Sequence, residues 1–207
     1  MNFSDVYWLG GSPCCGKSTV AGLLARRMGF RLYECDEHLE AYTLRGARQG
    51  SALMQRYLDK SADATWLRPV DRLTADEFAF YREAADFLAE DIAAFPPGSP
   101  LLVEGAAVTP EFAARFSLPL NRYFCMAPTP KFQVAEYEKR QWAKDYMATS
   151  SQPEQAFSNW MQRDIRFAEA VLRQAAALGY PVLLTDGSLS VEEVYQTVLQ
   201  AFGLAGP

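Results

Sequence analysis

The residues with the clearest chemical pattern form one short segment, GSPCCGKST, at positions 11–19. Gly11 and Gly16 bracket four variable residues, and Lys17 and Ser18 follow at once, so the segment matches G-x-x-x-x-G-K-[ST] in full. In this pattern backbone N–H groups bind phosphate oxygens, the lysine contacts the β- and γ-phosphates, and the serine hydroxyl ligates Mg²⁺. The residues predicted to contact a nucleotide are Gly11, Ser12, Pro13, Cys14, Cys15, Gly16, Lys17, Ser18 and Thr19.

The sequence on both sides of this segment supports the same interpretation. Residues 5–11, DVYWLGG, are typical of a strand, and residues 17–29 carry apolar side chains at helical spacing. A helix that begins at the motif directs the positive end of its dipole at the bound phosphates. A chance glycine-rich turn is the competing interpretation, and it is disfavoured because the complete motif lies between a strand and a helix.

Two carboxylates follow other apolar segments that are typical of strands. Asp36 ends the segment 30–36, where it could take a proton from a substrate hydroxyl or hold a Mg²⁺-bound water. Capping the next helix is the structural alternative for Asp36. Glu104 follows a nearly all-apolar strand, and we predict that it shares a metal site with Ser18, although contact with substrate is the alternative.

Three arginines late in the chain could stabilise the charge of a moving phosphoryl group. They are Arg140, Arg163 and Arg166, of which the last two share one helix face. A charged helix surface explains them equally well, because acidic residues lie nearby. Asp186, near the end of the apolar segment 180–187, is predicted to lie beside the adenine ring, or simply to lead into the last helix.

Apolar segments alternate with longer helical segments along the chain, which predicts one α/β domain over 1–207 with a parallel sheet. Ser190 and Glu193 predict a capping box for the last helix, which should end at Gly203. The expected strands are 5–11, 30–36, 100–105, 121–127 and 180–187. A helical insertion is expected over about 37–99, with helices at 38–60 and 74–95, and Thr74 and Glu77 have the spacing of a capping box at the start of the second helix. A lid is expected over about 130–168, and the helices of this region are predicted at 130–147 and 154–178.

Composition limits the partners and the compartment that we expect. The net charge of −5 argues against a nucleic-acid partner, and no apolar run approaches the roughly 18 residues of a membrane helix. The N-terminal residues lack the pattern of a secretory signal, and four cysteines without metal or C-x-x-C spacing suit a reducing cytoplasm. Cys14 and Cys15 occupy variable positions of the motif, and we expect neither to have a redox or metal-binding role. The helix N-terminus and Lys17 nevertheless predict a lowered pKa for these two thiols. We therefore expect alkylation or oxidation of Cys14 or Cys15 to block nucleotide binding.

On the motif, Asp36 and the late arginines, the chain resembles the small P-loop kinases grouped around nucleoside monophosphate, shikimate and gluconate kinases and chloramphenicol phosphotransferase. The resemblance implies a P-loop NTPase fold with a five-stranded parallel sheet in the order 2-3-1-4-5, an acid at Asp36 that faces the substrate hydroxyl, and a lid bearing the arginines. It also implies ATP and Mg²⁺ as cofactors and a small-molecule phosphoryl acceptor, in a monomer or homodimer. A nucleotide (monophosphate) kinase and a non-kinase nucleotide-binding switch are the alternatives, and GTP remains open as donor.

Overall fold

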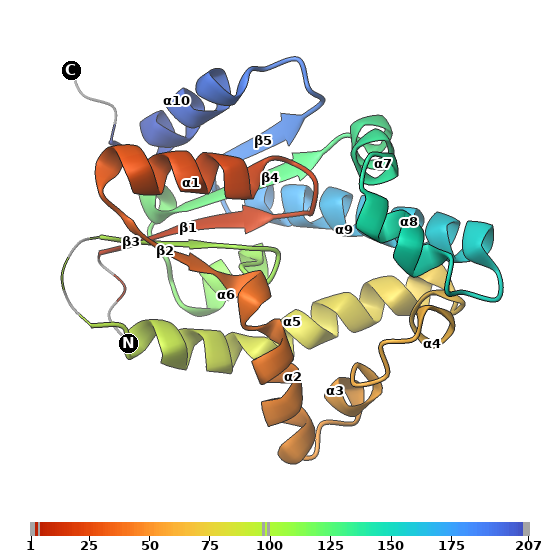
Figure 1. Cartoon of the computed structure of the whole chain (residues 1–207). Coiled ribbons are helices and arrows are strands. Elements are labelled where there is room, and N and C mark those ends of the chain that lie inside the picture. The colour runs from red at the N-terminus through yellow and green to blue at the C-terminus, as the bar shows by residue number, and fades with distance from the viewer. Residues whose placement is uncertain (1–2, 4, 97, 99, 205–207) are drawn as a thin grey trace.

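The chain folds around a parallel β-sheet (Figure 1). The computed structural model describes residues 3, 5–96, 98 and 100–204. The strands run in the order β2-β3-β1-β4-β5, and every pairing is parallel. The five-stranded parallel sheet and the strand order that the resemblance implied are therefore confirmed. The strands are β1 (Val6–Gly11), β2 (Arg31–Glu34), β3 (Leu101–Glu104), β4 (Tyr123–Pro128) and β5 (Val182–Thr185).

Helices cover both faces of the sheet. Because successive side chains of a strand point to opposite faces, Tyr7 and Leu9 of β1 pack with one group of helices while Val6 and Trp8 pack with another. Both faces of β1 are buried, which explains its nearly continuous apolar sequence. Helices α1 (Lys17–Met28) and α10 (Val191–Phe202) cover the first face, and α5 (Val70–Ala93), α6 (Pro110–Arg115) and α9 (Pro153–Ala177) cover the second.

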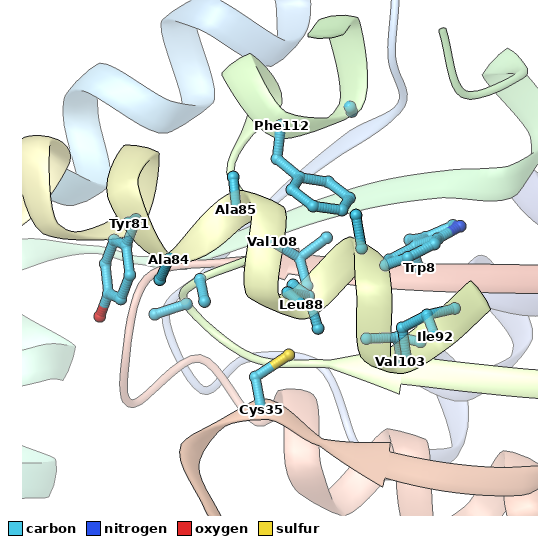
Figure 2. Packing of buried hydrophobic residues seen from close by; sticks show 14 of the residues in the cluster. Trp8, Cys35, Tyr81, Ala84, Ala85, Leu88, Ile92, Val103, Val108 and Phe112 are labelled. Carbon is cyan, nitrogen blue, oxygen red and sulfur yellow. The ribbon is translucent and has the colours of Figure 1, made fainter. Parts of the chain in front are cut away.

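The core under α5 holds the turn that follows β2 in place (Figure 2). Leu88 and Ile92 lie four residues apart on α5 and face Trp8 of β1 across the cluster. Cys35, the residue after β2, is 0% exposed and packs into the same cluster. The short 3₁₀ turn η1 (Cys35–Glu37) is thus anchored by its first residue, which fixes the position of the next one.

The insertion after β2 is more finely divided than the sequence predicted. A single helix over 38–60 is wrong, because the chain breaks after α2 (Leu39–Arg48) and restarts at α3 (Ala52–Arg56), where Ser51 accepts a hydrogen bond from the Met54 N–H. A short α4 (Ala62–Trp66) follows. The expected start at Thr74 is also wrong. Helix α5 already begins at Val70, and the Thr74 hydroxyl donates to the Val70 carbonyl instead of capping.

The region after β4 also differs from its prediction in one place that matters for the site. A single helix over 130–147 is wrong, since α7 (Pro130–Glu138) and α8 (Gln141–Met147) are separate helices. Arg140 lies between them with extended backbone angles, φ −87 and ψ 108. Its side chain therefore leaves the backbone in a direction that no continuous helix would give. No helix in the described part of the chain is long and apolar enough to span a bilayer.

The capping box of α10 is confirmed and gives a first test of the fold. The Ser190 side chain accepts from the Glu193 N–H at 3.3 Å, and the Glu193 carboxylate accepts from the Ser190 N–H at 2.8 Å. The helix ends at Gly203 as predicted. We expect Ser190→Ala to lower the free energy of unfolding by about 1 kcal/mol, measured by urea denaturation, because the first helical turn loses its acceptor. Ser190→Asp should keep the wild-type value. Equal stability of all three proteins would contradict this role.

Candidate functional site

The glycine-rich loop leaves β1 in close contact with the neighbouring strand β4. Gly11 has a φ of +121, and a Cβ at this position would come within 1.8 Å of the Met126 carbonyl oxygen. The same carbonyl accepts a hydrogen bond from the N–H of the buried Ser12 at 2.9 Å. Only glycine fits here, and the loop begins from a fixed point on the sheet.

Lys17, the first residue of α1, folds back over the loop. Its Nζ donates to the Ser12 carbonyl at 2.7 Å, and the residue is only 7% exposed. Burial alone lowers the pKa of Lys17, but the neighbouring Cys15, Glu104 and Asp36 outweigh burial, so the pKa is raised. The ammonium group therefore stays charged at neutral pH, in a position to exchange the Ser12 carbonyl for phosphate oxygens.

The two carboxylates predicted from the sequence lie at the same edge of the sheet as this lysine. Glu104 ends β3 and is 4% exposed, and burial raises its pKa while Lys17 and a hydrogen bond from Ser18 oppose that shift. The next residue, Gly105, has a φ of +147, and a Cβ there would lie 2.7 Å from the Cβ of Cys35. Glycine thus lets the ends of β2 and β3 approach closely.

Asp36 is exposed and lines the same cavity as Lys17 and Glu104. Helix α2 begins at Leu39 with His38 as its preceding residue, so Asp36 does not occupy the capping position that was its structural alternative. Its carboxylate is placed by the anchored turn and faces the loop.

Two adjoining cavities meet at the loop. The first, about 230 Å³, extends from the loop to Asp36, Glu104 and Ala106. The second, about 330 Å³, lies between α7 and α10, with Phe132 and Val194 among its apolar walls and Asp186 at its rim. Such walls suit a flat ring. The residues common to both cavities are Cys14, Cys15, Gly16, Thr19 and Arg140.

The three predicted arginines are placed differently from one another. Arg140, which the break between α7 and α8 releases from a helix, lines both cavities. Arg163 and Arg166 line neither. Arg163 forms ion pairs with Glu77 and Asp164, and Arg166 pairs with Asp71. The structure therefore brings one of the three to the loop. The buried acidic surroundings of Arg163 were not predicted, and no local motif marks them.

The thiols of the loop do not behave as the sequence predicted. Burial raises the pKa of Cys15, and burial raises that of Cys14 to about 11 although Arg140 opposes the shift. The predicted lowering of the thiol pKa is wrong. Burial in the loop raises the pKa of both thiols by more than the helix N-terminus and the nearby cations lower it.

A raised pKa leaves less thiolate at neutral pH, so Cys14 should react slowly in the folded protein. Its pKa of about 11 lies above the usual 9.0, so we expect alkylation by iodoacetamide at pH 8 to be about tenfold or more slower than in the urea-unfolded chain. The folded rate should rise about tenfold per pH unit up to pH 10. Fragment-ion mass spectrometry of the labelled peptide measures both. Equal folded and unfolded rates at pH 8 would contradict the enclosure.

The oxygen donors at the loop suit a magnesium ion held jointly with phosphate. In the described residues, no group of three or more His, Cys, Asp or Glu side chains could hold a metal by itself. Protein-bound Mg²⁺ commonly keeps several waters and is completed by substrate phosphates, so a closed cage is not required. The Ser18 hydroxyl lies against the buried Glu104, and Asp36 lines the same cavity. This donor set fits the predicted metal.

No family model and no curated protein sequence matches the chain. Among solved structures, a gluconokinase from Sinorhizobium meliloti is similar at 13% identity and a TM-score of 0.47, over 98% of this chain and 94% of that one. A deoxyadenosine kinase from M. mycoides with bound dATP is similar at 10% identity and a TM-score of 0.48, over 96% and 99%. At such low similarity these likenesses identify neither donor nor acceptor, so the function is inferred from the site.

Proposed function

We propose that the chain is a P-loop phosphotransferase that moves the γ-phosphoryl group of MgATP to a hydroxyl group of a small molecule. The observation that carries the proposal is the cavity that Lys17 and Asp36 line together from different elements, the start of α1 and the turn after β2. A triphosphate gripped by the loop would direct its γ-phosphoryl group into this space. A hydroxyl acceptor between that group and Asp36 is then within reach of a base.

Each residue of this cavity has a separate role in the proposed reaction. Lys17 contacts the β- and γ-phosphate oxygens, and Arg140 adds positive charge from the lid. Ser18 would hold Mg²⁺ directly, with Glu104 acting through its waters, and the bound ion would neutralise phosphate charge. The acceptor hydroxyl oxygen forms a bond to the γ-phosphorus, the bond to the β–γ bridging oxygen breaks, and Asp36 takes the hydroxyl proton.

The neighbouring apolar cavity supports a nucleotide rather than a simple polyphosphate as donor. It continues from the loop residues to Phe132 and Val194, which offer a ring two flat or apolar surfaces. Asp186 also lines this cavity, and its carboxylate accepts hydrogen bonds from the N–H and the hydroxyl of Ser188, at 2.9 and 2.5 Å, which hold the side chain in place.

The proposal is tested by measuring ADP release from MgATP, first alone and then with a panel of sugars, sugar acids, nucleosides and hydroxylated antibiotics. We expect slow release alone and fast release with at least one hydroxyl compound, together with a phosphorylated product by mass spectrometry. Thermal unfolding with a non-hydrolysable MgATP analogue narrows the panel, because a ligand of the native state raises the unfolding temperature. Fast release without acceptor that Lys17→Ala abolishes would identify an ATPase or switch instead.

A further inference from the structure

A buried polar network on the lid side of the site is unused by the reaction described above. Glu77 of α5 and Asp164 of α9 are 4% and 1% exposed, and Arg163 forms ion pairs with both. The Arg163 Nε lies 2.6 Å from an Asp164 oxygen. Two carboxylates and one guanidinium in the protein interior are costly unless each member is paired, so the network has to be held together by further partners.

The network continues from Asp164 to Arg140, which lines the two cavities at the loop. The second Asp164 oxygen accepts a hydrogen bond from the Tyr137 hydroxyl at 2.9 Å, and Tyr137 is 4% exposed. The Arg140 guanidinium lies over the Tyr137 ring, 5.0 Å from its centroid. One end of this ring is thus fixed by a buried carboxylate, and its face supports the arginine that lines both cavities.

The same network is fastened to the insertion that follows β2. Arg163 lies 4.8 Å over the Trp66 ring at the end of α4, and that ring stacks on Trp160 of α9 at 4.9 Å. Asn159 donates to the Trp66 carbonyl at 2.8 Å. The insertion and the support beneath Arg140 therefore share one packed cluster.

We propose that Tyr137, Asp164 and Arg163 are positioning residues that hold the Arg140 guanidinium at the nucleotide triphosphate. Arg140 lies in the break between α7 and α8, where no helix fixes its direction, so the Tyr137 ring sets where its guanidinium lies. Arg163 contributes through Asp164 and touches no phosphate. This inference rests on the proposed function, since it takes Arg140 to bind the triphosphate.

A double-mutant cycle in MgATP affinity tests the inference without an acceptor. Arg140→Ala should raise the Kd of MgATP, by isothermal titration calorimetry, by roughly tenfold or more, the effect of losing a charge-assisted contact. Tyr137→Phe and Asp164→Asn should each raise it several-fold when Arg140 is present and should add nothing in the Arg140→Ala background. Affinity for adenosine, which has no phosphate, should stay the same in Tyr137→Phe and Asp164→Asn, because neither residue lines either cavity.

One further protein, Tyr180→Phe, and the smaller of the two substitutions above separate positioning from loss of fold. Tyr180→Phe removes another buried tyrosine hydroxyl, which donates to the Leu118 carbonyl at 2.9 Å at the amino end of β5, and it should leave the Kd of MgATP unchanged. If Asp164→Asn fails to fold, Tyr137→Phe still decides, because it removes one oxygen atom. Additive effects in the Arg140→Ala background, or an unchanged Kd in folded Tyr137→Phe, would overturn the positioning role. An unchanged Kd in Lys17→Ala would instead overturn the proposed function.

Discussion

Lys17→Ala is expected to raise the Kd of MgATP by about 10²–10⁴-fold, the loss of two charge-assisted hydrogen bonds to phosphate oxygens. The lysine is buried and stays charged, so its ammonium group is already desolvated and oriented before the nucleotide arrives. Its removal also leaves Glu104 and Asp36 beside the incoming phosphates without a compensating cation. Isothermal titration calorimetry with MgATP measures the change.

The matched control for this experiment is Lys60→Ala. Lys60 pairs with Glu40 at 2.9 Å on the surface, with 67% of its side chain exposed, and it should bind MgATP as the wild type does. Thermal unfolding of both variants shows whether the fold survives. A folded Lys17→Ala protein with wild-type affinity would mean that the loop does not hold phosphate.

The second large effect is expected at Asp36. Asp36→Asn keeps the size of the side chain but removes its ability to accept a proton, so kcat with a hydroxyl acceptor should fall roughly 10²–10⁴-fold. The affinity for MgATP should change little, because Lys17 and the loop carry that binding. Steady-state kinetics with the acceptor found in the screen, combined with calorimetry, separates the two quantities.

Glu37→Gln serves as the control for Asp36, since Glu37 is the next residue, is also exposed, and is not part of the cavity lining. It should keep its kcat. A loss of less than tenfold in Asp36→Asn would argue against proton removal at this position. Combined with activity on a nucleoside monophosphate, that result would favour the nucleotide kinase alternative, in which the acceptor is already ionised.

The strands and the phosphate loop could be predicted because their signals are local. Each observed strand lies within its expected range, except that β4 continues to Pro128. The loop motif contains in one short segment both the glycine and the lysine that the geometry needs, and Gly11 indeed approaches Met126 too closely for any side chain. The position of Asp36 followed from the rule that parallel strands end at one edge.

The helical region could not be predicted in detail because tertiary contacts decide it. Thr74 and Glu77 have the spacing of a capping box, yet Glu77 is buried against Arg163 and Thr74 lies inside the helix. Arg163 carries the same sequence signal as a lid arginine that contacts phosphate. Two carboxylates hold Arg163 away from the loop instead. Asp164 lies on the same helix, but Glu77 belongs to α5 and is remote in the sequence.

The close approach of Gly105 to Cys35 has a consequence for how this sequence can change over evolutionary time. Any side chain at position 105 would meet the Cys35 Cβ at 2.7 Å, and an Asp36 carboxylate oxygen lies 3.6 Å from the same point. Position 35 is enclosed by the core as well. Substitutions at either position would strain the backbone or the core and would also displace Asp36, so under the proposed function they should lower activity by more than their loss of stability alone accounts for. Selection on activity should consequently restrict this pair more tightly than selection on folding alone.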